Sequence, residues 1–254
     1  MNFVKVENIG KVAKITICNE KALNAMNTEI LQEISDTFAA INPEEVYCVV
    51  LTGQGGKAFV AGADISEMAV KFGKEGEIFG QVGNKAMRNV EICPVPVIAA
   101  VNGFALGGGN ELAMASDIRL CSANAVFAQP EAGLGITPGF GGTQRLGRVL
   151  GSMSMAKEIL YSGRNVKADE ALRIGLVNAV YDTQEELMEA AMKLAEKIAK
   201  NAPFAVRACK KAINEGIEMP MEKAMLFEAQ LFGSCFDTQD QKDRMEAFLN
   251  KGKK

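Results

Sequence analysis

Apolar residues along the chain change their spacing several times, and these changes predict alternating strands and helices. Short apolar runs typical of strands occur at VAKITI (12–17), VYCVVLTG (46–53) and PVPVIAAVNG (94–103). The third run is continuous, as expected for a strand buried on both faces. Between the first two runs, residues 27–41 predict a helix capped by Asn27 or Thr28, with apolar side chains at helical spacing at Ile30, Leu31, Ile34 and Phe38.

The same alternation continues through the middle of the chain and then stops. Further strands are predicted at 117–122, 125–129 and 173–181, and a helix is predicted at 167–174. From Thr183 onward the pattern is wholly helical. We therefore expect an α/β core over residues 1–195 that holds the active site, and a helical region over residues 196–254 that packs on the core or on a partner subunit.

The composition is that of an ordinary globular protein, with 48% hydrophobic and 23% charged residues among 254. This length suits one large domain, or one domain with a small appendage. The net charge of -3 and the lack of a long basic run argue against nucleic-acid or membrane partners. No secretion signal is visible and the six cysteines form no C-x-x-C pair, so we expect a cytoplasmic protein with reduced thiols.

The chain contains no histidine, and this limits the chemistry more than any other count. Ser-His-Asp and Cys-His nucleophilic catalysis are excluded, as are histidine-ligated zinc and histidine general bases. In an enzyme without a metal, the acid and the base are then carboxylates, with Lys, Tyr or Cys as less favoured substitutes.

The stretch AVNGFALGGGNELAMASDIRL (100–120) places three consecutive glycines between a buried strand and a helix. Glycine lets the backbone approach a ligand, and the first N–H groups of a helix favour an anion or an oxyanion. A P-loop needs Gly-Lys-Ser/Thr where this chain has Asn110 and Glu111, and a dinucleotide fingerprint needs a glycine three residues further on. The turn suits an oxygen that becomes negative only transiently. A junction that merely needs small residues is the alternative.

Two other glycine-flanked stretches have a similar character. GKAFVAGADISEM (56–68) follows a predicted strand, and FAQPEAGLGITPGFGGTQRL (127–146) carries Glu131 in a turn-like setting. Two glutamates, Glu111 and Glu131, therefore lie near glycine-lined turns in a chain without histidine. This pattern favours a pair of carboxylates that work as acid and base.

Long ordered stretches of the chain resemble the crotonase (enoyl-CoA hydratase/isomerase) superfamily. They are KALNAMN (21–27), KAFVAGADISEM (57–68), PVIAAVNGFALGGGNELAMASDIRL (96–120), FAQPEAGLGITPGFGGTQRL (127–146) and KADEALRIGLVNAV (167–180). The match covers nearly the whole chain. FGQVGNKAMR and ITPGFGGTQRL are most similar to the short-chain bacterial members of butyrate-forming metabolism.

The resemblance implies a fold, an assembly and a substrate. The fold is a spiral α/β core of repeated β-β-α units with a helical C-terminal region, which packs a homotrimer and covers the active site. The trimers stack as a homohexamer. The substrate is an acyl-CoA thioester, so coenzyme A belongs to the substrate and no metal or other cofactor is needed.

The resemblance also implies roles for individual residues. Glu111 and Glu131 flank a bound water, and the backbone N–H groups of Ala63 and Gly108 form an oxyanion hole. CoA contacts fall on Lys21, Ala22, Leu23, Ala61, Asp64 and Ile65. Residues 69–92 are expected to line the acyl pocket. The chain departs from the family where it reads Cys18-Asn19-Glu20-Lys21 in place of the usual Asn-Arg-Pro-Lys, and where Asn110 replaces a common cysteine.

The sequence leaves one expected function and two alternatives. With both glutamates present, the expected function is hydration of short-chain trans-2-enoyl-CoA, such as crotonyl-CoA, to the 3-hydroxyacyl thioester and the reverse dehydration. A double-bond isomerase is the alternative, because one glutamate can move a proton between C2 and C4. An RNA-binding relative of the hydratases is a second alternative, and the net charge of -3 argues against it.

Overall fold

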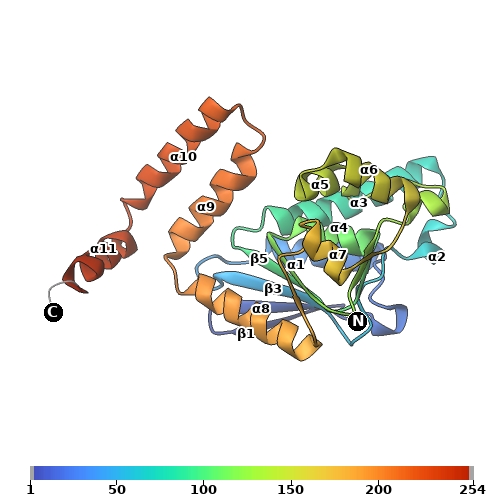
Figure 1. Ribbon diagram of the computed structural model, residues 1–254, viewed down its shortest axis with the longest axis horizontal. Helices are drawn as coiled ribbons and strands as arrows, with labels where there is room; N and C mark the ends of the chain where they lie inside the picture. Colours follow the sequence, from blue (N-terminus) through green and yellow to red (C-terminus); the bar gives the residue numbers. More distant parts are fainter. Residues whose placement is uncertain (1–2, 252–254) are drawn as a thin grey trace.

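The computed structural model describes residues 3–251, and its central element is a six-stranded sheet covered by helices (Figure 1). The strand order is β1-β2-β3-β5-β7-β10. β1 and β2 form an antiparallel hairpin, and each later strand pairs in parallel with its neighbour. The bounds are Val4–Ile9, Val12–Ile17, Cys48–Gly53, Val97–Val101, Ile118–Ser122 and Ala179–Tyr181.

A smaller sheet of four short strands stands beside the first, in the order β4-β6-β8-β9. Its strands are Ala58–Val60, Phe104–Leu106, Val126–Ala128 and Val166–Lys167. β3, β5 and β7 of the large sheet are each followed by one of these short strands, and then by helical structure. This order confirms the expected repetition of β-β-α units.

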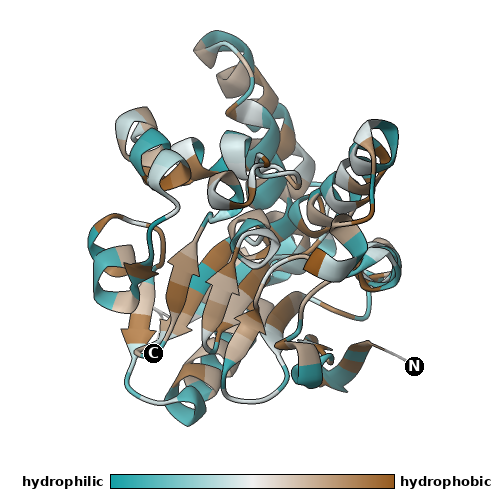
Figure 2. Ribbon diagram, turned by 90° about the vertical axis from the view of Figure 1, so that its right-hand side faces the viewer, coloured by the Kyte–Doolittle hydropathy of each residue, from teal (hydrophilic) through white to brown (hydrophobic). Residues whose placement is uncertain are grey.

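Helices cover both faces of the large sheet, which explains why its central strands β3 and β5 are buried at every position. One core cluster contains Val49 and Leu51 of β3, together with α1 (Thr28–Ala39), α3 (Gly73–Glu91) and α4 (Gly108–Ala115). Val50 of the same strand points to the other face, where it joins Leu187 and Ala191 of α8 (Gln184–Ala199). Figure 2 shows these strands as largely hydrophobic.

Several predicted elements are confirmed and one is wrong in extent. The helix predicted at 27–41 is α1, and Asn27 is its cap because its side chain accepts a hydrogen bond from the N–H of Ile30 at 2.9 Å. The strand predicted at 173–181 is restricted to β10. The preceding residues end α7 (Ala168–Arg173) and turn at Gly175, whose φ of +78° suits glycine.

Within the described residues, three further helices and two 3-10 turns precede α8. Their bounds are Ile65–Met68 for α2, Gly142–Leu150 for α5 and Met153–Ser162 for α6, with 3-10 turns η1 at Glu20–Ala22 and η2 at Glu131–Leu134. None of the helices within residues 3–251 is both long and apolar enough to span a membrane.

The last three helices stand away from the sheets in Figure 1: α9 (Pro203–Gly216), α10 (Met221–Cys235) and α11 (Gln239–Lys251). A boundary after residue 195 falls inside α8, which packs on the sheet to its end, so the break in packing comes at residues 200–202. Lys210 of α9 ties this region to the core through an ion pair of 2.7 Å with Asp117. Residues 1–2 and 252–254 of the two expected regions lie outside the described chain.

Candidate active site

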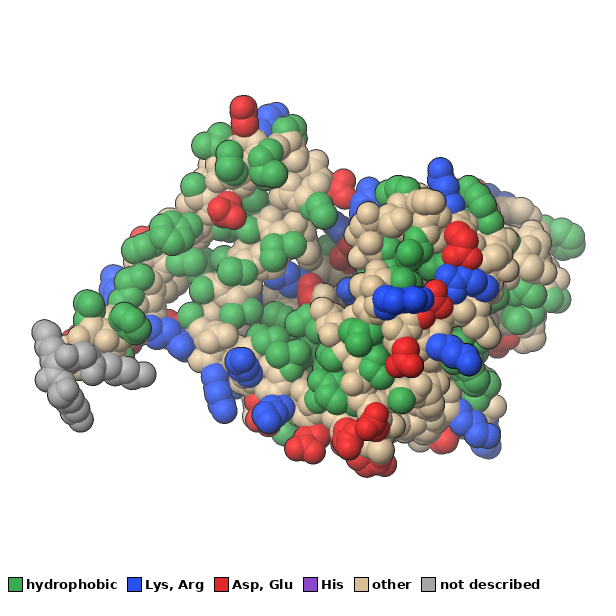
Figure 3. Space-filling view, in the orientation of Figure 1, with side chains coloured by type: hydrophobic (Ala, Val, Ile, Leu, Met, Phe, Trp, Pro, Cys, Tyr) green, Lys and Arg blue, Asp and Glu red, His purple; other side chains and the backbone are tan. Residues whose placement is uncertain are grey.

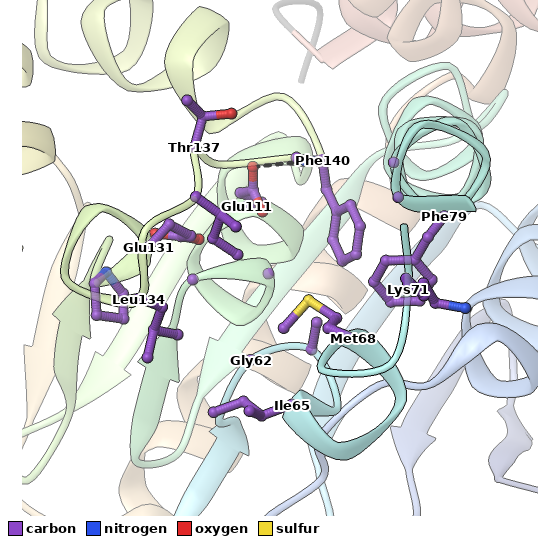
Figure 4. Close-up of a pocket in the computed structure, with 18 of the residues that line it drawn as sticks. Gly62, Ile65, Met68, Lys71, Phe79, Glu111, Glu131, Leu134, Thr137 and Phe140 are labelled. Carbon is purple, nitrogen blue, oxygen red and sulfur yellow. Dashed lines mark hydrogen bonds between the residues drawn. The ribbon is translucent and has the colours of Figure 1, made fainter. Parts of the chain in front are cut away.

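A cavity of about 530 Å³ opens at the loops that follow β4, β6 and β8 of the small sheet, and both predicted glutamates line it (Figure 4). Glu111 comes from the first turn of α4, and Glu131 begins η2. The backbone of Ala63 and Gly108 lines the same cavity. The structure therefore brings together all four residues expected to carry the chemistry, from three separate β-β-α units.

At each of the three glycines before Glu111, a side chain would collide with a different neighbour. A β-carbon on Gly107 would lie 2.7 Å from the Glu131 carboxylate, and its φ of +49° is left-handed. One on Gly108 would lie 3.0 Å from the Phe140 ring, and one on Gly109 would lie 1.8 Å from the carbonyl oxygen of Val60. The close approach of β4 lets α4 be buried along its whole length.

The N–H groups of Ala63 and Gly108 are free to bind a ligand. Within the described part of the chain, neither amide donates a hydrogen bond to a backbone acceptor. Gly108 is the first residue of α4, where N–H groups have no intrahelical acceptor and the helix dipole is positive. Such amides favour an oxygen that carries negative charge.

Glu111 is almost completely buried, at 1% exposure, and its carboxylate is held by backbone. Its Oε1 accepts hydrogen bonds from the N–H of Phe140 at 2.9 Å and of Gly142 at 2.6 Å. Burial raises the pKa of Glu111 to about 7. The hydrogen bonds from Gly142 and Phe140 and the charge of Arg145 oppose this rise, whereas Glu131 adds to it.

Glu131 is also buried, and burial raises its pKa to about 7. The preceding Gln129 is fully buried beside it. With its amide nitrogen turned toward the carboxylate, the orientation that satisfies both groups, Gln129 donates to Oε1 at 3.0 Å and to Oε2 at 3.1 Å. The amide therefore fixes the direction in which Glu131 points.

The two glutamates are matched for proton transfer near neutral pH. Both have a pKa of about 7, and the charge of Glu131 makes ionisation of Glu111 less favourable. A state with one proton on the pair is then well populated, with one carboxyl ready to donate and one carboxylate ready to accept. This arrangement can perform acid–base chemistry without histidine or metal.

The cavity wall beside the carboxyls is apolar. Ile65, Met68 and Leu134 line one side, and Phe79 packs edge-on against Phe140 with ring centroids 5.4 Å apart. The segment 69–92, expected to line the acyl pocket, contributes Lys71, Phe72, Gly73, Gly76, Phe79 and Gly80. Such a wall suits the apolar part of a ligand.

The residues expected to contact CoA lie in two segments that run side by side. The N–H of Ala61 donates to the carbonyl of Leu23 at 3.0 Å. Lys21, Ala22 and Leu23 are exposed, and Ala61 and Ile65 line the cavity. Asp64 differs, because its carboxylate caps α2 by accepting from the N–H groups of Ser66 and Glu67. Its side chain therefore supports the loop that carries Ala63.

Within the described part of the chain, no group of three or more Cys, Asp or Glu side chains is arranged to hold a metal ion. The absence of a cofactor stays a prediction, since coenzyme A is expected as part of the substrate.

Sequence reasoning missed four side chains around the glutamates: Gln129, Asn84, Arg145 and Glu91. Gln129 stands two residues before Glu131, and Arg145 lies in the stretch 127–146 already singled out, so the sequence could have indicated both residues. Glu91 and Asn84 lie on α3, more than fifty residues before their partners Arg145 and Gly139. No spacing rule connects residues so far apart in the chain.

Comparison with known proteins identifies the family of the chain. The sequence model of the enoyl-CoA hydratase/isomerase family matches residues 7–254. A short-chain-enoyl-CoA hydratase of Clostridium acetobutylicum is 56% identical over 100% of this chain and 97% of its own. A crotonyl-CoA hydratase of Syntrophomonas wolfei is 51% identical over 98% of this chain and 95% of its own.

Solved structures agree as well. The crystal structure of an enoyl-CoA hydratase from Bacillus anthracis superimposes with a TM-score of 0.93 at 38% identity, covering 98% of this chain and 96% of that one. The resemblance seen in the sequence and the predicted fold class are thereby confirmed. The chain belongs to the enoyl-CoA hydratase/isomerase family.

Proposed function

We propose that this protein is a short-chain enoyl-CoA hydratase, which interconverts trans-2-enoyl-CoA and 3-hydroxyacyl-CoA, with crotonyl-CoA as its four-carbon substrate. One observation carries the proposal: two buried carboxyls with raised pKa values share a cavity with two backbone N–H groups that have no backbone acceptor within residues 3–251. The names and full-length identity of the two bacterial relatives support the same reaction.

In hydration, Ala63 and Gly108 receive the thioester oxygen. Ionised Glu111 takes a proton from water as the water oxygen bonds to C3, and the electron pair of the double bond moves to the enolate. Protonated Glu131 then delivers its proton to C2, which completes a syn addition. Dehydration reverses each step. Each N–H donor can contribute roughly 3–4 kcal/mol to the transition state, and each positioned carboxyl about 10²–10⁴-fold in rate.

The C-terminal helices support a proposed homotrimer, stacked as a homohexamer. Ile213, Ile217, Met221, Leu226 and Phe232 are each more than 60% exposed on α9 and α10. Figure 3 shows hydrophobic side chains spread over these helices. Large exposed apolar patches of this kind mark protein interfaces. The proposal includes a cytoplasmic location, a role in butyrate metabolism and no cofactor beyond the substrate's coenzyme A.

The test is to give the purified protein crotonyl-CoA and 3-butenoyl-CoA separately, to follow water addition by mass, and to separate the two isomeric thioesters by chromatography. We expect a gain of one water with crotonyl-CoA. Rapid conversion of 3-butenoyl-CoA to crotonyl-CoA, with no water gained, would make the protein an isomerase instead. A series of longer 2-enoyl thioesters should show falling kcat/KM. Each methylene that the cavity cannot hold should cost about 1–3 kcal/mol of transition-state binding.

A further inference from the structure

Arg145 lies behind the active site and not in it. This residue of α5 is absent from the cavity wall, and its side chain is only 13% exposed. Its guanidinium donates to the carbonyl oxygen of Phe140 at 2.9 Å and pairs with Glu91 at 3.0 Å. Glu91 is the last residue of α3, and its own carbonyl accepts from Asn214 of α9 at 3.2 Å. The pair is therefore anchored by three separate helices.

The backbone segment 139–142, here called the 139–142 turn, connects this pair to Glu111. The N–H groups of Phe140 and Gly142 donate to Glu111, and Figure 4 draws the first of these bonds as a dashed line. The carbonyls of the same turn are held from behind, that of Phe140 by Arg145 and that of Gly139 by Asn84 at 2.7 Å. The direction of the two amides thus depends on what holds the carbonyls.

We propose that Arg145, paired with Glu91, is a positioning residue that holds the 139–142 turn so that its two amides keep the carboxylate of Glu111 aimed into the cavity. The proposal rests on the proposed function, in which Glu111 is the base of hydration. Arg145 itself touches neither substrate nor reacting atoms. A charge-assisted bond to a carbonyl is stronger than a neutral one, which suits a buried anchor of this kind.

The charge of Arg145 acts in the same direction as its geometry. The charged groups near Glu111 are Glu131 across the cavity, Lys71 on its rim and Arg145 behind the turn, with Glu91 and Arg88 next to Arg145. Because the charge of Arg145 lowers the pKa of Glu111, its removal raises that pKa. Neutralising Glu91 leaves Arg145 uncompensated, and so lowers the same pKa.

These opposite signs give a test that a merely structural role would not pass. Arg145→Met and Glu91→Gln are compared with Arg148→Met, a control at an exposed arginine one turn further along α5. The kcat and KM for crotonyl-CoA are measured from pH 5 to 9. For Arg145→Met we expect kcat to fall about 10–100-fold, since small misplacements of a catalytic group have effects of this size. KM should change little, and the acid limb of kcat should move to higher pH.

For Glu91→Gln, we expect the acid limb to move to lower pH with a smaller loss of kcat, and for Arg148→Met neither to change. Arg145→Met with normal kcat and an unmoved acid limb would overturn the proposal. So would an acid limb that moves to higher pH in both Arg145→Met and Glu91→Gln. Should Arg145→Met fail to fold, Arg145→Lys takes its place beside Glu91→Gln. Arg145→Lys keeps the charge, so its kcat should fall without a shift of the acid limb. An unchanged kcat in Arg145→Lys would contradict the proposal.

Hydrogen exchange provides a readout that does not depend on activity. In Arg145→Met, the amides of Phe140 and Gly142 should exchange faster by about tenfold, with little change elsewhere in α5. Unchanged exchange in this segment would contradict the role of Arg145 even if the variant were slow. If the wild-type protein does not hydrate crotonyl-CoA, the proposed function fails, while the exchange result still decides whether Arg145 holds the turn.

Discussion

The N–H of Gly142 donates to Glu111 Oε1 at 2.6 Å, and a β-carbon on Gly142 would lie only 2.9 Å from the same oxygen. The glycine therefore both supplies a hydrogen bond and leaves the space that the carboxylate occupies. Any side chain here keeps the donor but displaces the acceptor.

Gly142→Ala should lower kcat by about 10–100-fold, because the carboxylate must shift by several tenths of an ångström or more. The extra carbon should reduce the free energy of unfolding by about 1–3 kcal/mol. Kinetics with crotonyl-CoA and urea unfolding measure the two effects. Gly133→Ala is the matched control, since its β-carbon meets nothing within 4 Å. Equal kinetics for the two variants would mean that Glu111 tolerates displacement.

Glu111→Gln and Glu131→Gln should each cut kcat by about 10²–10⁴-fold while thioester binding survives. The amide oxygen that Glu111→Gln introduces can still accept from Phe140 and Gly142, so the turn should stay in place. Turnover and calorimetric binding of a CoA thioester are the two measurements. Near-normal hydration by either variant would remove that residue from the mechanism.

An ester in place of the amide at Gly108, made by semisynthesis, should lower turnover by roughly 10²–10³-fold. The replacement deletes the N–H donor with little change in shape, and the lost bond is one that strengthens as the enolate forms. The same change at Ala63 should behave alike, because both amides line one cavity. Loss of binding alone, with turnover intact, would show that the glycines only make room for the substrate.

The raised pKa values also predict how stability depends on pH. Glu111 and Glu131 have pKa values of about 7 in the folded protein, against an ordinary value of 4.5. Between these values the folded state binds more protons than the unfolded state, so stability should fall as pH rises from about 4.5 to about 7. At pH 8 the cost per site is on the order of 3 kcal/mol.

Urea unfolding at pH 5 and pH 8 tests this expectation. Glu131→Gln should lose less stability between the two pH values than the wild type does. Glu189→Gln, at a position on the outer side of α8, should behave like the wild type. A wild-type protein and a Glu131→Gln variant with the same pH dependence would contradict a raised pKa at this site.

The sequence predicts best where one local pattern determines the structure. β3 follows from an apolar run and ends where expected, at Gly53. α8 follows from helical spacing and begins directly after Thr183, where the helical pattern starts. Among the 31 acidic residues, Glu111 and Glu131 could be selected because they lie beside glycine-lined turns in a chain without histidine, and because these stretches resemble a known family.

Packing between distant segments is where sequence reasoning stops. Glycines at 73, 76, 80 and 83 dilute the helical signal of α3. The structure explains one of them, since a β-carbon on Gly83 would lie 2.0 Å from the Phe140 ring. The Arg145–Glu91 pair joins α5 to the end of α3 across 54 positions, so it becomes visible only once the helices are placed.

The glycine run before α4 also determines how far this active site can be remodelled by directed evolution. Randomising position 109 selects only for folding, because any side chain would strike the backbone of Val60. Position 107 couples chain conformation to the placement of Glu131, so few replacements there would leave a useful catalyst. At position 108 the neighbours are the side chains of Phe140 and Met26, which can be redesigned together with it. Of these three consecutive glycines, Gly108 is thus the one at which substitution can be combined with redesign of the neighbouring side chains.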